Sequence, residues 1–206
     1  MKKGGDVNIR QLFGVLIGGL FLTLVISIYK SKVINTTVLI QAGHEGRTKG
    51  NIGSVQGDLK EVDWNIQITK MIEKELKKHN IDVTRVGAEI PVTNTRIAIS
   101  IHFDGAERPC STGASIGYDV NHINSKKLAN SWKRKYKGYF PFKWHHDNFT
   151  KNLSDYYGFS RVNSEKGFLV LELGEITCIN QTNWLKPRLE LIALRIADFI
   201  MEELDK

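Results

Sequence analysis

The sequence VLIQAGH at residues 38–44 is a short apolar run that ends at a histidine, His44. Two later runs have the same form: IAISIH ends at His102, and FLVLE ends at Glu172. A short apolar run that enters a polar loop is typical of a buried strand. Because ligands of open α/β sheets lie beyond the carboxyl ends of parallel strands, these three polar side chains are expected to meet at one edge of a sheet.

Amphipathic stretches separate the apolar runs. Within residues 61–80, Ile68, Ile72 and Leu76 recur on one side with lysines on the other, which predicts a helix. Strands that alternate with helices indicate an α/β fold, with a mostly parallel twisted sheet flanked by helices. The other predicted elements are two strands, at 81–86 and 114–120, and two helices, at 125–137 and 186–204.

Length and composition limit the class of protein. The chain has 206 residues, of which 41% are hydrophobic and 25% charged, so it suits one globular domain with a short appendage. These values exclude a disordered chain, a collagen-like repeat and a polytopic membrane protein. Two cysteines are too few for a disulfide-rich miniprotein or a cysteine-only zinc cluster. The net charge of +7 is compatible with an anionic partner.

The amino-terminal segment predicts membrane attachment. Residues 12–29 read LFGVLIGGLFLTLVISIY and contain no charged side chain. A helix of that length spans about 27 Å, close to the hydrocarbon core of a bilayer. The bases that flank the run favour an amino terminus in the cytoplasm. No convincing small-x-small cleavage site lies near residues 27–32, so we predict an uncleaved signal-anchor, with a cleaved signal peptide as the alternative. The predicted organisation is a cytoplasmic tail at 1–11, one transmembrane helix at 12–29, a linker at 30–36 and a catalytic domain at 37–206 outside the cytoplasmic membrane.

The strand-end residues suit a catalytic metal site. Glu61 follows a glycine-rich loop and opens a predicted helix, so it can point toward His44 and His102. Two imidazoles and one carboxylate form a zinc site with a fourth position left for water. Glu172, outside that coordination, suits a general base, and the chemistry implied is metal-assisted hydrolysis. Each residue also has a plainer interpretation, such as a hydrogen-bonded strand-end histidine or a carboxylate that favours a helix N-terminus.

Several short motifs occur in one order along the chain. Read together, they resemble the zinc-dependent N-acetylmuramoyl-L-alanine amidases of the type 3 class, which are cell-wall hydrolases. The resemblance covers about residues 38–204. The motifs are Ala42-Gly43-His44, Lys60-Glu61, Val83-Thr84-Arg85, Ser100-Ile101-His102 and the run from Leu169 to Gly174 that contains Glu172.

The resemblance implies a function and a role for each site residue. His44, Glu61 and His102 would bind one zinc ion, and Glu172 would act as general base and then as general acid. The substrate would be peptidoglycan, cut at the amide between the lactyl group of N-acetylmuramic acid and L-alanine of the stem peptide. Zinc would lower the pKa of a water molecule and polarise the scissile carbonyl.

The chain departs from the family pattern at two places. The family usually has a helix between the Thr-Arg strand and Ser-Ile-His, but here only residues 87–96 lie between them, too few for that helix. The family often has asparagine two residues after the second histidine, where this chain has Asp104. Both changes leave the four predicted site residues intact.

A basic and aromatic segment follows the fourth predicted strand. Residues 126–143 hold seven bases and no acid, and aromatic residues continue to Phe159. This segment could form a lip of the substrate groove, attract anionic lipid, bind single-stranded nucleic acid, or be a solvated helix face followed by a satellite cluster. An exported domain rarely meets nucleic acid, so no such partner is expected. His145-His146-Asp147 is not expected to form a second metal site, because adjacent side chains diverge.

The two cysteines follow strands that are expected to end at the same edge. Cys110 lies eight residues after His102, and Cys178 lies six residues after Glu172. If the domain is exported, a disulfide between the two loops is one hypothesis and two unpaired thiols are the other.

Rival functions remain beside the amidase. One is a non-catalytic peptidoglycan-binding or regulatory module on the same fold, and another is a zinc amidohydrolase that acts on a different amide. A basic nucleic-acid-binding protein is a third, but it leaves the strand-end residues unexplained.

Overall fold

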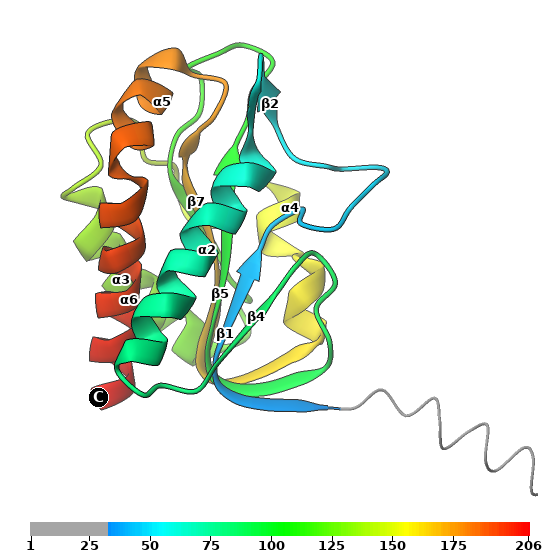
Figure 1. The fold of residues 1–206 in the computed structure, drawn as a ribbon, viewed down its shortest axis with the longest axis vertical. Helices are drawn as coiled ribbons and strands as arrows, with labels where there is room; N and C mark the ends of the chain where they lie inside the picture. The colour runs from blue at the N-terminus through cyan, green and yellow to red at the C-terminus, as the bar shows by residue number, and fades with distance from the viewer. Residues whose placement is uncertain (1–32) are drawn as a thin grey trace, which may run out of the picture. The chain divides into compact units, whose positions relative to one another are not determined.

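The structure, a computed structural model, describes residues 33–206, which form one unit (Figure 1). Its main sheet has five strands in the order β4-β1-β5-β7-β6. The first four are parallel to one another, and β6 runs antiparallel to β7. This confirms the predicted α/β fold with a mostly parallel sheet. In chain order the five strands are β1 (Ile34–Ala42), β4 (Val83–Val86), β5 (Thr93–Asp104), β6 (Ser115–Gly117) and β7 (Val162–Glu175).

Three long helices were predicted and all three are present. Their bounds are α2 (Glu61–Lys78), α3 (Ile123–Lys137) and α6 (Leu189–Asp205). The shorter elements were not predicted. They are a two-stranded hairpin of β2 (Val55–Gln56) and β3 (Leu59–Lys60), the helices α4 (Lys151–Ser154) and α5 (Ile179–Leu185), and the 3₁₀ turns η1 (Tyr157–Ser160) and η2 (Lys186–Arg188).

One face of the sheet carries the large core. Alternate residues of a strand point to opposite faces. Ile97, Ile99 and Ile101 of β5 all belong to the apolar cluster that contains the buried side chains of α2, α3 and α6. The three long helices therefore cover the same face. In Figure 1 they lie together on one side of the sheet, and the short α4 lies on the other.

The opposite face is covered by a connection without a helix. β4 ends at Val86, beside Gln41 of β1, whereas β5 begins at Thr93, beside Ile34. Residues 87–92 must therefore run back along most of the length of β1 in a nearly extended form. The connection is too short for the helix that the family usually has there, as predicted. The buried side chains of this smaller core are Leu39, Ile90, Ala98, Val162 and Phe168.

β7 is longer than the sequence predicted. It begins at Val162, whereas the apolar run begins only at Phe168. Gly167 has a φ of 131°, and the pairing of β5 with β7 shifts register between Thr95 and Ile97. This bulge interrupts the alternation of side chains, so the polar first half of the strand shows no strand period. The predicted strand at 114–120 is also shorter in the structure, where β6 has three residues.

The cysteine hypothesis is confirmed, because Cys110 and Cys178 form a disulfide. The bond ties the loop after β5 to the segment between β7 and α5. The buried carboxylate of Glu175 supports the same junction, since it accepts hydrogen bonds from the backbone amides of Cys110 and Thr112, each at 2.7 Å. The two loops beyond the strand ends are therefore held together.

The predicted cytoplasmic tail and transmembrane helix, residues 1–11 and 12–29, lie outside the described residues, as do residues 30–32 of the predicted linker. Within residues 33–206, none of the helices combines the length and the apolar character needed to cross a bilayer.

Candidate metal centre

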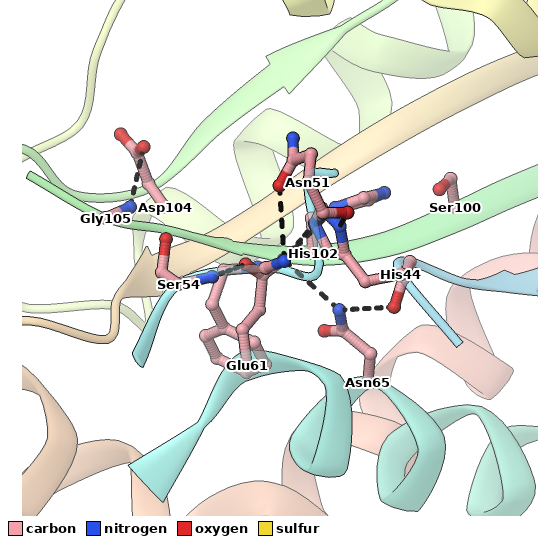
Figure 2. A network of polar contacts seen from close by, with 12 residues as sticks. His44, Asn51, Ser54, Glu61, Asn65, Ser100, His102, Asp104 and Gly105 are labelled. Carbon is pink, nitrogen blue, oxygen red and sulfur yellow. Dashed lines mark hydrogen bonds and ion pairs between the residues drawn. The ribbon is translucent and has the colours of Figure 1, made fainter. Parts of the chain in front are cut away.

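His44, Glu61 and His102 converge at the carboxyl ends of β1 and β5. The Oε1 atom of Glu61 lies 3.1 Å from Nε2 of His44 and 3.1 Å from Nδ1 of His102. The two imidazole nitrogens are 3.2 Å apart. Figure 2 shows the three side chains pointing toward one another from two strand ends and the first turn of α2. All three are buried.

Local backbone geometry places the two imidazoles. His44 has a φ of 66°, in the left-handed region, and this turns its side chain out of the strand direction. The residue before it must be glycine, because a Cβ at Gly43 would overlap with the imidazole ring of His102. The motif Ala-Gly-His therefore serves both histidines: it carries one and makes room for the other.

Further hydrogen bonds hold Glu61 and His44 in place. The Oε2 atom of Glu61 accepts from the backbone amide of Ser54 at 2.8 Å, and Oε1 accepts from Nδ2 of Asn65 at 3.2 Å. The Nδ1 atom of His44 lies 3.0 Å from the backbone carbonyl oxygen of Asn51. A carbonyl can only accept, so Nδ1 carries the proton and the lone pair on Nε2 faces Glu61.

The donor set fits zinc. Imidazole nitrogens and a carboxylate oxygen are usual zinc ligands, and ligands about 2.0–2.1 Å from a tetrahedral zinc ion are about 3.3 Å from one another. The three atoms named above are separated by 3.1–3.2 Å. Among the described residues, this is the one group of three histidine, cysteine or acidic side chains with that geometry.

The charges in the site favour an ionised carboxylate. Burial alone would raise the pKa of Glu61, but the two imidazoles more than offset this and hold it well below its usual range. Burial lowers the pKa of His102 despite the contact with Glu61. For His44, burial also acts to lower the pKa, but the Glu61 carboxylate outweighs it and raises the value.

Glu172 lies on the neighbouring strand, in register with His102. Its Oε2 atom is buried, and no described residue forms a hydrogen bond with it. Burial raises the pKa of Glu172 well above its ordinary value, and the negative charges of Glu61 and Asp104 raise it further. A carboxyl group of this kind can hold or release a proton near neutral pH.

A groove of about 590 Å³ opens over these residues. Its floor includes His102 of β5 and Val170 and Glu172 of β7, which alternate along strands on the face that the long helices leave free. The walls come from the loop after β1 and from α4 with the turn that follows it. The structure thus places all four predicted site residues along one groove.

The basic and aromatic segment divides between two roles. Tyr156 and Tyr157 line the groove, in agreement with the predicted lip. Trp132, Tyr136 and Phe140 instead belong to the large core, whereas the alternative interpretation of the segment predicted a satellite cluster. Sequence reasoning named the two tyrosines only as members of a group, because nothing in their spacing separates them from the core aromatics.

The bases of this segment are partly paired on the surface. Lys133 contacts Asp147 and Lys135 contacts Glu202, each at 2.7 Å. His145 is buried and stacks on Phe149, with ring centroids 3.8 Å apart. That the His-His-Asp run has no metal role stays a prediction from the sequence.

Residues 38–202 match the family model described as N-acetylmuramoyl-L-alanine amidase. The chain belongs to this amidase family. Family members are peptidoglycan hydrolases, so the chain is classed as an amidase of the cell wall, and the family is zinc-dependent. No curated protein matches the chain.

Solved amidase structures share the fold. An N-acetylmuramoyl-L-alanine amidase from Clostridium difficile 630 is 21% identical, with a TM-score of 0.63 over 84% of this chain and 98% of that one. The catalytic domain of CwlV from Bacillus (Paenibacillus) polymyxa is 18% identical, with a TM-score of 0.64 over 82% and 98%. CwlD from Clostridioides difficile, solved in complex with the GerS lipoprotein, is 17% identical, with a TM-score of 0.57 over 83% and 99%.

The packing of the His102 ring on Gly43 gives a direct test of the site. In Gly43→Ala the new methyl group displaces the ring, so we expect metal affinity to fall by about tenfold or more. Competition with a chromophoric chelator measures this. Gly138→Ala is the matched control, because its φ is −74° and its Cβ would meet a backbone oxygen at an ordinary 3.7 Å. Equal affinity in the two variants would contradict the assigned geometry.

Proposed function

We propose that this amidase cleaves the bond between N-acetylmuramic acid and L-alanine with one zinc ion held by His44, Glu61 and His102. The observation that carries the proposal is the convergence of two imidazole nitrogens and one carboxylate oxygen beside the partly buried carboxyl group of Glu172 in the same groove. Membership of the amidase family supports the substrate class. The three ligands leave a fourth position free, which hydrolysis requires.

In this proposal Glu172 moves the proton. Zinc, when bound, lowers the pKa of the attacking water and polarises the scissile carbonyl. The carboxylate of Glu172 takes the proton from that water, holds it, and gives it to the nitrogen of the leaving L-alanine. Its Oε2 atom is available for this role, because no described side chain or backbone group occupies it. A raised pKa suits both halves of the transfer, since the group must accept and then release the proton.

The same site allows two other outcomes. A module that binds peptidoglycan without cutting it would hold zinc but release no product. An amidohydrolase with a different substrate would cut an amide, but would expose no new amino terminus on L-alanine. Both are distinguished from the proposed activity by product analysis.

Glu172→Gln tests the proposed reaction. Residues 33–206 and this variant are incubated with purified peptidoglycan, with and without a zinc chelator, and the fragments are identified by mass spectrometry. We expect cleavage at the lactyl–alanine amide to fall by about 10²–10⁴-fold in the variant and to stop on chelation. Glu165→Gln is the matched control, because Glu165 is an exposed residue of the same strand. Undiminished activity in Glu172→Gln would remove Glu172 from the mechanism.

The pH dependence gives a second test. Glu172 must be ionised to accept a proton, and its pKa lies above the ordinary 4.5. We therefore expect kcat/KM to fall as the pH drops through this raised pKa. Asp104→Asn removes one of the charges that raise it, so the acid limb should move to lower pH. Asp155→Asn removes a groove carboxylate that is not among the causes of the shift, and it should leave the limb in place. An unmoved limb in Asp104→Asn would contradict this account.

We also propose that the catalytic domain acts outside the cytoplasmic membrane, anchored by residues 12–29. The disulfide between Cys110 and Cys178 supports export, because such bonds persist in oxidising compartments. The uncharged run at 12–29 has the length of a membrane span. In a cell fractionation, the full chain should sediment with membranes and a chain that lacks residues 1–32 should not. Recovery of the full chain in the soluble fraction, with its disulfide reduced, would overturn this proposal.

A further inference from the structure

A tyrosine lies behind one of the metal-site histidines. The hydroxyl oxygen of Tyr156 is 3.5 Å from Nε2 of His102, the ring nitrogen that points away from Glu61. Within the described residues, this is the polar contact recorded for that nitrogen. Tyr156 comes from the segment between β6 and β7, directly before η1. The direction in which the Tyr156 hydroxyl proton points therefore affects which nitrogen of the His102 imidazole carries a proton.

A chain of hydrogen bonds decides which way that proton points, and it begins at a backbone carbonyl. The carbonyl oxygen of Ala88 can only accept, and the hydroxyl of Tyr157 donates to it. Tyr157 has one hydroxyl proton, so toward Gln41 it can only accept. The Nε2 atom of Gln41 lies 2.8 Å away and donates to it. This fixes the orientation of the Gln41 amide, with Oε1 on the opposite side.

The next step reaches Tyr156. The Oε1 atom of Gln41 can only accept, and the Tyr156 hydroxyl lies 2.6 Å from it. The Ser100 hydroxyl also donates to this oxygen, so Oε1 of Gln41 accepts from both hydroxyls. The other contacts of the Tyr156 hydroxyl, to Ser100 at 3.2 Å and to Tyr157 at 3.4 Å, are longer. The proton of Tyr156 therefore points at Gln41, and only lone pairs remain on the side of His102.

The consequence falls on the tautomer of His102. Because Tyr156 offers lone pairs, the favoured imidazole carries its proton on Nε2 and has the lone pair on Nδ1. That lone pair faces Nε2 of His44 and Oε1 of Glu61. His44 is fixed in the matching way by the carbonyl of Asn51. Three acceptor atoms then converge with no proton between them, an arrangement that a bound cation stabilises.

We propose that the path from Ala88 through Tyr157, Gln41 and Tyr156 is a positioning relay that holds His102 in the tautomer required to bind zinc through Nδ1. The inference rests on the proposed zinc-binding function of the triad and adds three positioning residues to it. Burial strengthens the relay: Gln41 is 1% exposed, and burial raises the pKa of the Tyr156 hydroxyl, which keeps its proton.

The relay also gives a role to two unusual parts of this chain. Ala88 belongs to the extended connection at 87–92, which stands where the family usually has a helix. The two tyrosines come from the long segment before β7. Gln41 lies on the sheet face that the long helices leave free, where it can reach both tyrosines. Because residues 87–92 form no helix, the carbonyl oxygen of Ala88, where the relay begins, is free of helical hydrogen bonds and can accept from Tyr157.

Zinc affinity is the first test of the relay. Tyr156→Phe keeps the ring and removes the hydroxyl, and we expect it to weaken zinc binding by about 10–100-fold, the usual effect of losing an outer partner of a metal-bound histidine. Tyr157→Phe removes the hydrogen bond to the Ala88 carbonyl and should cause a smaller loss of zinc affinity. Tyr139→Phe is the matched control, because it makes the same change at a tyrosine packed against the large core, whose hydroxyl has no hydrogen-bond partner among the described residues, and its affinity should stay within about twofold. Circular dichroism and thermal melting check that each variant is folded.

The state of His102 is the second test. In zinc-loaded protein, ¹⁵N chemical shifts of the imidazole should show a protonated Nε2 and a metal-bound Nδ1. Equal zinc affinity of Tyr156→Phe and the original chain, an equal loss in Tyr139→Phe, or zinc bound through Nε2 would overturn the relay while the amidase function stands. If the original chain binds no zinc, the proposed function itself fails, so the two failures are distinct.

Discussion

The structure of the site depends on one buried carboxylate held between two imidazoles. An ionised Glu61 without partners would be costly in this position, because a buried charge loses its hydration. Backbone amides and Asn65 satisfy part of its hydrogen-bonding capacity, and the two imidazole nitrogens face the rest. With both histidines in the tautomers that their outer partners favour, the three atoms that meet are all acceptors. A divalent cation is the group that satisfies such an arrangement, and this requirement links the sequence motifs to the chemistry.

The asymmetry of the fold serves the same purpose. Three long helices cover one face of the sheet, while an extended connection and short turns cover the other. Side chains that alternate along β5 and β7 therefore point to the thinly covered face, where His102 and Glu172 line the groove. The disulfide and Glu175 hold the loops beyond these strands together. Substrate can approach without any helix moving aside.

Strand-end chemistry is what the sequence predicted well. Short apolar runs that end at His44, His102 and Glu172 show both the strands and the site, because parallel strands bring their carboxyl ends to one edge. Glu61 was predicted from its place at the start of a helix after a glycine-rich loop. The hypothesis of a disulfide between Cys110 and Cys178 came from the same topology, because both cysteines follow strands that end at this edge.

What the sequence did not show depends on contacts between distant segments. The relay joins residues 41, 88, 156 and 157, whose hydrogen bonds leave no periodic pattern in the chain. The first half of β7 was missed because a bulge at Gly167 breaks its alternation. The sequence also does not show that all three long helices cover the same face of the sheet. An amphipathic pattern indicates that a helix packs on the sheet, but it does not indicate on which face. Residues of this kind are found only when the side chains are placed in space.

Anomalous diffraction at the zinc absorption edge, from crystals of residues 33–206 grown with zinc, tests the central claim most directly. The account predicts one strong peak, bonded to Nε2 of His44, Nδ1 of His102 and the carboxylate of Glu61, with the Glu172 carboxyl group facing the remaining position. A peak elsewhere, a bond through Nε2 of His102, or no peak with the three ligand atoms still 3.1–3.2 Å apart would contradict it.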